Sequence, residues 1–137
     1  MTLGERLFLD TWFVIALLNA DDEHHVEAVK RLADIETAAD VVVSEAVLTE
    51  IANSFAAHDR RGAVRFIRHC YDTDNISVVP VDGALFQRGV DRYSARPDKD
   101  WGLTDCISFV IMEDRGVVQV ATRDKHFEQA GFTRMFS

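Results

Sequence analysis

Four acidic residues lie next to strongly apolar segments of the sequence: Asp10, Glu50, Asp105 and Asp124. The first is the most unusual. In "RLFLDTWFVIALLN" (residues 6–19), Asp10 separates an apolar run typical of a buried strand from one typical of a buried helix. An unpaired carboxylate in such surroundings costs on the order of several kcal/mol in lost hydration. We therefore expect a partner that compensates the charge of Asp10.

The other three carboxylates are expected at the same edge of a sheet. Asp124 follows the fourth predicted strand. Glu50 lies in the second turn of the helix that leaves the second strand, at the edge of the apolar stripe, so we expect it to be semi-buried. Asp105 lies in the first turn of "TDCISFVIM" (104–112), a helix that is apolar almost all round. Open parallel sheets bind ligands at the carboxyl ends of their strands, which favours a functional role.

Each carboxylate also has an ordinary structural explanation: a helix-dipole acid for Asp105, the start of a turn for Asp124, a surface ion pair for Glu50. Their convergence is the stronger indication, because four carboxylates at one edge repel one another unless a cation is bound. Oxygen ligands favour Mg²⁺ or Mn²⁺, and we do not expect zinc because no histidine or cysteine accompanies them. Such ions support phosphoryl transfer.

Strands and helices alternate along the chain. Strand-length apolar runs lie at residues 7–9, 41–43, 76–81 and 117–121. Helical periodicity extends over residues 13–19, 23–35, 45–57, 62–70, 84–93 and 105–114. Strands joined by helical crossovers predict a central parallel sheet covered on both faces, a three-layer α/β/α sandwich.

Capping residues support these boundaries. Ser44 and Thr104 are predicted helix N-caps, and Gly116 stands where a helix C-terminal glycine is expected. The segment "SARPDKDWG" (94–102) predicts an irregular loop, and "GFTRMFS" (131–137) a short edge strand.

The composition, 47% hydrophobic and 28% charged over 137 residues, predicts one globular domain spanning residues 1–137. A net charge of −8 argues against broad coating of nucleic acid, but allows a nuclease with an acidic metal site. Cys70 and Cys106 are expected to be reduced packing residues. The acidic N-terminal stretch and the lack of a run of about 20 apolar residues predict a cytoplasmic protein with no signal peptide and no membrane association.

Four segments resemble, in order, the acidic motifs of PIN-domain proteins: "FLDTWFVIALLN", "SEAVLTEIANSF", "WGLTDCISFVIM" and "VATRDKHFEQAGF". The similarity extends from about residue 7 to residue 132, and the chain length is similar to that of VapC-type toxin ribonucleases. The resemblance implies Mg²⁺- or Mn²⁺-dependent endonucleolytic cleavage of RNA, a homodimer, and a small antitoxin protein that occupies the site.

The resemblance also implies roles for individual residues. The metal-binding and catalytic quartet would be Asp10, Glu50, Asp105 and Asp124, with polar neighbours at Thr11, Thr104 and Thr122. One position departs from the family pattern, because Trp12 stands where many PIN-domain proteins carry a small residue. The shape of the pocket beside Asp10 is therefore expected to differ.

Basic residues near the predicted site are candidates for contacts with substrate phosphates: Lys99, Arg123 and Lys125. The arginines between residues 60 and 68 are more simply explained as a solvated helix face. His126, two residues after Asp124, has two alternatives: it approaches the site, or, as we expect more strongly, it is a surface histidine.

Three other functions compete with a metal-dependent ribonuclease. A haloacid-dehalogenase-like phosphatase would need a second acid two residues after Asp10, where Trp12 stands. A receiver domain would need clustered acids before the end of the first strand, whereas Asp21 and Asp22 follow it. A non-catalytic PIN-like module that binds RNA or protein stays open, because four acids indicate competence for metal rather than turnover.

Overall fold

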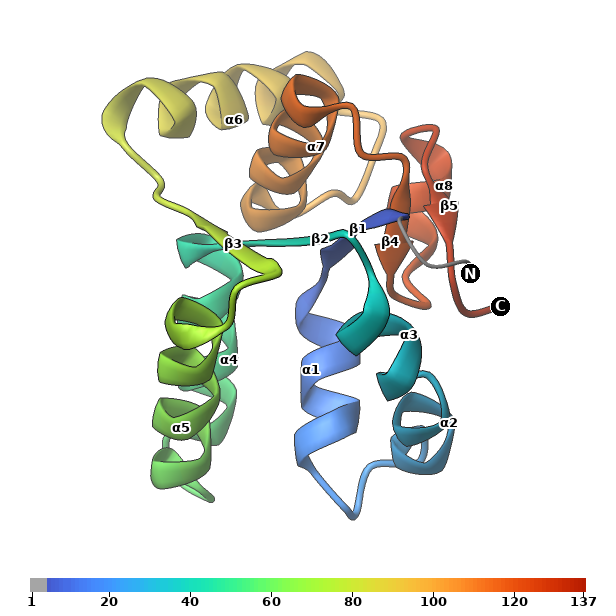
Figure 1. Ribbon diagram of the computed structural model, residues 1–137. Helices are drawn as coiled ribbons and strands as arrows, with labels where there is room; N and C mark the ends of the chain where they lie inside the picture. Colours follow the sequence, from blue (N-terminus) through green and yellow to red (C-terminus); the bar gives the residue numbers. More distant parts are fainter. Residues whose placement is uncertain (1–4) are drawn as a thin grey trace.

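The computed structural model describes residues 5–137 and has a five-stranded parallel sheet at its centre (Figure 1). Residues 1–4, the start of the N-terminal stretch used to argue against a signal peptide, lie outside the described residues. The strand order is β3-β2-β1-β4-β5, and every neighbouring pair is parallel. The strands are β1 (Arg6–Leu9), β2 (Asp40–Ser44), β3 (Ile76–Val79), β4 (Gln119–Ala121) and β5 (Thr133–Arg134).

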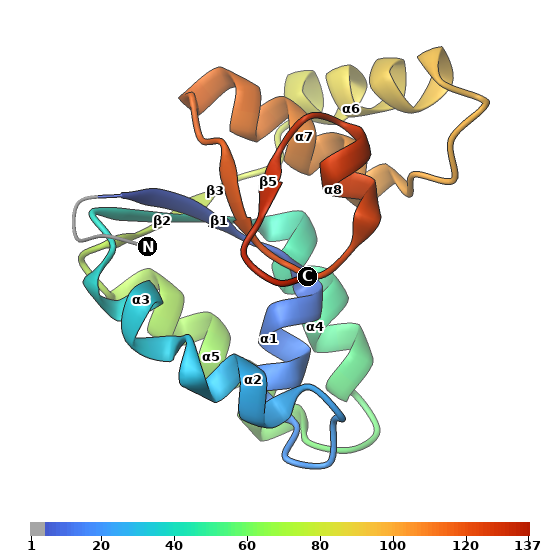
Figure 2. The same cartoon turned by 90° about the vertical axis from the view of Figure 1, so that its right-hand side faces the viewer.

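Helices cover both faces of the sheet. They are α1 (Thr11–Leu18), α2 (His25–Lys30), α3 (Leu32–Thr37), α4 (Glu45–Phe55), α5 (Arg60–Asp72), α6 (Gly83–Ala95), α7 (Leu103–Arg115) and α8 (Lys125–Gln129). Helices α1 to α5 lie on one face, whereas α6 and α7 lie on the other, and α8 lies beside β5 (Figure 2). The predicted three-layer α/β/α sandwich is confirmed. Within residues 5–137 no helix has the length and apolar character of a membrane span.

The register of the sheet brings two distant segments together. Strand β1 lies between β2 and β4, and its apolar side chains are almost completely buried. Leu9 pairs with Ala121, so the next residues, Asp10 and Thr122, leave the sheet side by side. Since all strands are parallel, both lie at the carboxyl edge where ligands of such sheets bind.

Two strands are shorter than predicted, each for a local reason. Strand β3 ends at Val79 because Pro80 has no N–H group for the ladder. Strand β4 begins only at Gln119, because the hydrogen bonds that end α7 still include Val117. Its N–H donates to the carbonyl of Met112, and Gly116 adopts the left-handed conformation (φ 66°) expected of a helix-ending glycine.

Several predicted helix boundaries need correction. The helix expected at 23–35 is two helices, α2 and α3, separated at Arg31, whose guanidinium donates to the carboxylate of Asp34 and the carbonyl of Met135. Ser44 caps α4 as predicted, accepting a hydrogen bond from Val47 N–H. Thr104 is not a cap, because α7 begins at Leu103.

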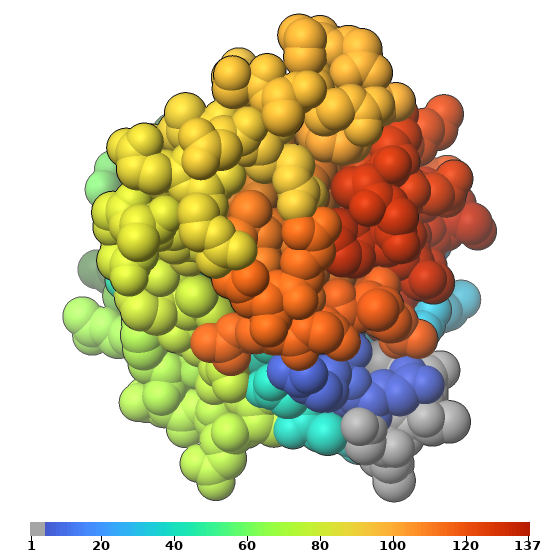
Figure 3. All heavy atoms as spheres, turned by 90° about the horizontal axis from the view of Figure 1, so that it is seen from above, coloured from blue at the N-terminus to red at the C-terminus, as the bar shows by residue number. Residues whose placement is uncertain are grey.

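Helix α7 is the central element of its face (Figure 3). Its side chains from Cys106 to Met112 are all buried, and its orange atoms lie between the yellow atoms of α6 and the red C-terminal segment. The two helices approach closely at Gly89, where a Cβ atom would lie 2.5 Å from Cγ1 of Ile107. This packing fixes the position of the α7 N-terminus relative to the sheet. Cys70 and Cys106 are free and buried, as predicted.

Candidate metal centre

Asp10 is the most deeply buried carboxylate of the candidate site. It precedes α1 in the N-cap position, with 5% of its surface exposed. Burial raises the pKa of Asp10 to about 7; a 2.7 Å hydrogen bond from the Thr122 hydroxyl opposes this shift, and the charges of Asp105 and Asp124 add to it. Among residues 5–137 no basic side chain forms an ion pair with Asp10. The carboxylate therefore lacks a compensating positive charge.

The hydroxyl of Thr122 connects two of the carboxylates. It donates to Oδ2 of Asp10 and accepts a 3.0 Å hydrogen bond from the backbone N–H of Asp124. Thr122 itself is fully buried at the end of β4. A single buried hydroxyl thus fixes the spacing between the end of β1 and the start of α8.

Asp105 and Asp124 are brought together from the N-termini of two helices. Asp105 lies in the first turn of α7 and accepts a 3.1 Å hydrogen bond from Gly102 N–H. Asp124 caps α8, accepting a 2.9 Å hydrogen bond from His126 N–H. Burial raises the pKa of Asp105, and its hydrogen bond with His126 opposes that shift. Both acids therefore stabilise helix ends and also face each other.

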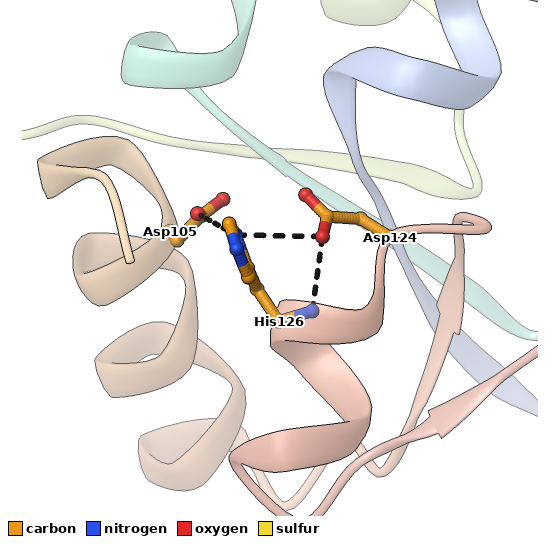
Figure 4. Close-up of side chains that lie close together, drawn as sticks. All are labelled: Asp105, Asp124 and His126. Atoms are coloured by element: carbon orange, nitrogen blue, oxygen red, sulfur yellow. Dashed lines mark hydrogen bonds and ion pairs between the residues drawn. The ribbon is translucent and has the colours of Figure 1, made fainter. Parts of the chain in front are cut away.

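His126 lies between these two carboxylates (Figure 4). Its Nδ1 is 3.0 Å from Oδ2 of Asp105 and 3.4 Å from Oδ1 of Asp124. Of the two alternatives for His126, the surface position is therefore wrong and the approach to the site is what the structure has. The signal available in the sequence was a capping Asp followed two residues later by a His.

The set of side chains fits a divalent cation. One carboxylate oxygen each of Asp105 and Asp124 and a ring nitrogen of His126 lie within 4.8 Å of one another, and Asp10 is electrostatically coupled to both acids. The expectation that no histidine accompanies the carboxylates is therefore wrong, and the argument against zinc that rested on it no longer holds. Oxygen-rich sites with one imidazole suit Mn²⁺ as well as Mg²⁺.

Glu50 is exposed, which corrects the expectation that it is semi-buried. It lies on α4 outside the set of buried residues of that helix, which are Val47, Leu48, Ile51 and Phe55. Its Oε1 accepts a 2.6 Å hydrogen bond from the hydroxyl of Thr11, the neighbour of Asp10. The structure thus connects Glu50 to Asp10 only indirectly, through Thr11, and does not group it with Asp105, Asp124 and His126.

Thr104 has a different environment from the other two threonines. The hydrogen bond described for it within residues 5–137 uses its carbonyl, which accepts from the hydroxyl of Ser108 at 2.9 Å. Thr11 and Thr122 hydrogen-bond carboxylates through their hydroxyls, and Thr104 has no such bond in the described structure. The reason is that Thr104 lies inside the first turn of α7 rather than at its cap.

Two of the three basic candidates lie beside Asp124. Arg123 and Lys125 line a pocket of about 460 Å³ with Asp124. The guanidinium of Arg123 donates to the carbonyl of Ser137 and lies 3.0 Å from Nε2 of His24. Lys99 is half-buried in the loop between α6 and α7 and does not line this pocket.

Trp12 forms one wall of the same pocket. Its ring packs against the ring of His24 (centroids 5.2 Å apart) and against Phe136 (5.0 Å). The large side chain beside Asp10 therefore joins α1 to the segments before α2 and after β5. This contact explains a tryptophan where the sequence alone suggested no role.

Comparisons with known proteins show the family and the fold of the chain. The model of the PIN domain family matches residues 7–133. No curated protein sequence matches the chain. The crystal structure of VapC20 from Mycobacterium tuberculosis, a sarcin–ricin loop cleaving toxin, superposes with a TM-score of 0.83 at 25% identity, covering 93% of this chain and 96% of that chain.

Two further crystal structures share the fold at lower identity. VapBC2 from Rickettsia felis, bound to a DNA fragment from its promoter, has a TM-score of 0.66 at 10% identity, covering 96% of this chain and 98% of that one. FitAcB from Neisseria gonorrhoeae has a TM-score of 0.61 at 18% identity, covering 96% of both chains. Since the family model spans nearly the whole chain, this protein belongs to the PIN domain family and resembles its VapC-type members.

Proposed function

We propose that this protein is a Mg²⁺- or Mn²⁺-dependent endoribonuclease and the toxin of a toxin–antitoxin pair. The observation that carries the proposal is the convergence of three carboxylates, Asp10, Asp105 and Asp124, with no basic side chain paired to the buried Asp10 within residues 5–137. A divalent cation is the natural compensation for such a cluster. The PIN domain family comprises nucleases, and the similarity to a toxin supports the choice of RNA as substrate.

The side chains around the proposed cation have distinct tasks. When bound, the cation would neutralise the scissile phosphate and lower the pKa of the attacking water. Asp10, Asp105 and Asp124 would hold it from the buried side, and Glu50 from the exposed side. Thr122 keeps the Asp10 carboxylate in place with its hydrogen bond, and Thr11 does the same for Glu50.

The substrate would be held mainly by a small basic region. The net charge of −8 leaves no broad basic face, so contacts with RNA are expected to be local. Arg123 and Lys125 lie beside Asp124 and would contact the phosphates next to the scissile bond, with Lys99 as a more distant contact. Because the similar VapC20 is a toxin that cleaves the sarcin–ricin loop, we propose a structured ribosomal RNA as the substrate.

The test is cleavage of RNA by the purified protein. Ribosomal RNA and an unstructured RNA are incubated with the protein in Mg²⁺, Mn²⁺ or a chelator. We expect metal-dependent cleavage by the wild type and none by Asp105→Asn. A matched control is Asp114→Asn, because Asp114 lies at the other end of α7 and pairs with the exposed Arg88. Binding of RNA without cleavage by the wild type would instead favour a non-catalytic PIN-like module.

The proposed partners need separate experiments. The resemblance to VapC-type toxins supports a small antitoxin protein, a homodimer and a cytoplasmic location. Co-expression with the product of a small reading frame upstream is expected to suppress cleavage, and sedimentation of the purified protein is expected to give a mass of two chains. Full activity in the presence of that product would contradict the antitoxin proposal.

A further inference from the structure

His126 lies in the site, but a metal centre made of four acids assigns it no role. Its position is fixed from two sides: its backbone N–H donates to Asp124, and its ring lies against Asp105 at the α7 N-terminus. The side chain is 29% exposed, so the ring is neither in the core nor free in solvent. Figure 4 shows the ring pointing into the space between the two carboxylates.

The distances around Nδ1 are those found between ligands of one metal ion. In octahedral sites with bonds of about 2.1 Å, adjacent ligand atoms stand about 3.0 Å apart and opposite ones about 4.2 Å. Nδ1 of His126 lies 3.0 Å from the Asp105 oxygen and 3.4 Å from the Asp124 oxygen. The three donor atoms are all within 4.8 Å of one another. The ring nitrogen therefore stands at ligand spacing from both acids.

We propose that His126 supplies a nitrogen ligand, through Nδ1, to the cation held by Asp105 and Asp124, and that it makes the site favour Mn²⁺ over Mg²⁺. The inference rests on the proposed function, since it concerns the same cation. Mg²⁺ prefers oxygen ligands and keeps several waters, whereas Mn²⁺ accepts imidazole nitrogen more readily. One imidazole among carboxylates thus changes the relative affinity for the two ions.

A merely structural role for His126 makes a different prediction. If the ring only donates a hydrogen bond that holds Asp105 and Asp124 in place, loss of the ring weakens the binding of Mg²⁺ and of Mn²⁺ by the same factor. Asparagine separates the two roles, because its amide places an N–H group where the imidazole has Nδ1 but offers no nitrogen lone pair to a metal. His126→Asn therefore preserves the hydrogen bond and removes the nitrogen ligand.

The experiment measures the binding of Mg²⁺ and of Mn²⁺ by calorimetry at one fixed pH, without RNA. The variants are His126→Asn, His126→Ala and the matched control His58→Asn, since His58 is exposed between α4 and α5. We expect Mn²⁺ affinity to fall by about tenfold or more in both His126 variants, because even neighbours of ligands contribute that much. Mg²⁺ affinity should fall by about threefold or less, and the control should match the wild type.

A spectroscopic readout tests the bond itself. Pulsed electron paramagnetic resonance of the Mn²⁺-loaded wild type and of His58→Asn should show coupling to an imidazole nitrogen, and His126→Asn should lose it. An unchanged Mn²⁺ to Mg²⁺ ratio, or a wild type without nitrogen coupling, would overturn the ligand assignment but leave the proposed nuclease intact. A wild type that binds neither ion would overturn the proposed function and this inference together.

Discussion

We propose that Asp10 and Glu50 hold the same cation, although Asp10 is buried and Glu50 is exposed. Asp10 is buried at the end of the central strand, and its hydroxyl partner Thr122 comes from the neighbouring strand, 112 positions along the chain. Glu50 is exposed on α4, and its described partner is Thr11, at the start of another helix. Asp10 is therefore held by the sheet, and we expect the exposed Glu50 to adjust to the ion and the substrate.

The largest expected difference between the two sides is in activity. Asp10→Asn should lower the rate of RNA cleavage by up to about a thousandfold, the upper range for loss of one fixed electrostatic contact. Glu50→Gln should lower it by about tenfold, because water can replace an exposed carboxylate around Mg²⁺. Single-turnover cleavage assays at saturating Mg²⁺ measure both. Equal losses in the two variants would remove the distinction between a fixed and an adjustable side.

Asp10→Asn should lower the activity but raise the stability of the metal-free protein. Because the pKa of Asp10 rises from its ordinary value of 3.8 to about 7, the folded state keeps a proton that the unfolded chain releases. This contribution is present in full below pH 4 and is lost as the pH rises to about 7. At pH 8, Asp10→Asn should therefore stabilise the metal-free protein by on the order of 4 kcal/mol. Urea unfolding at pH 5 and pH 8 measures the free energy of unfolding of the wild type and of Asp10→Asn. Glu50→Gln is the control, and its free energy of unfolding is expected within about 0.5 kcal/mol of the wild type.

Affinity for Mg²⁺ should depend on pH through the buried side, where burial raises the pKa of Asp10 to about 7 and also raises the pKa of Asp105. The proton on Asp10 must leave before its carboxylate can bind the ion, so affinity should rise by up to about tenfold per pH unit below pH 7 through this group. Calorimetric titrations at pH 6, 7 and 8 measure the slope. Glu50→Gln should keep this slope and Asp10→Asn should reduce it; a flat profile in the wild type would show that Asp10 is ionised throughout.

The smallest effects are expected from the two hydroxyl partners. Thr122→Val removes a buried hydroxyl that donates to Asp10 and accepts from Asp124 N–H, and should cost about 1–3 kcal/mol of stability. Thr11→Val removes a solvent-exposed hydrogen bond and should cost less than about 0.5 kcal/mol. Thermal unfolding of both variants measures the difference, which would vanish if the Thr122 hydroxyl were replaceable by water.

Features decided locally were predictable from the sequence. The apolar runs identified β1 and β2, and the position of Asp10 immediately after one of them identified the edge at which the acids meet. The helical segment that begins near Asp105 was recognised as central because it is apolar on every side. These predictions needed only periodicity and the order of elements along the chain.

Features decided by packing between distant elements were not predictable. The contact of His126 with Asp105 depends on how α8 lies against α7, and the Asp-x-His pattern at residues 124–126 indicates only that His126 lies near Asp124. The exposure of Glu50 depends on how the other elements pack around α4, which a helical projection cannot show. The true start of α7 depends on the hydrogen bond between Gly102 and Asp105, so Thr104 was assigned the wrong role.

The hydrogen bond between Thr122 and Asp10 also bears on the order in which the protein is made. Strand β1 is synthesised first but lies between β2 and β4, so its second neighbour does not exist until residue 121 has been added. A nascent chain that stops short of residue 124 lacks one of the three clustered carboxylates. The site can therefore be completed only after residue 124 has been added, and a growing chain shorter than that carries no assembled site.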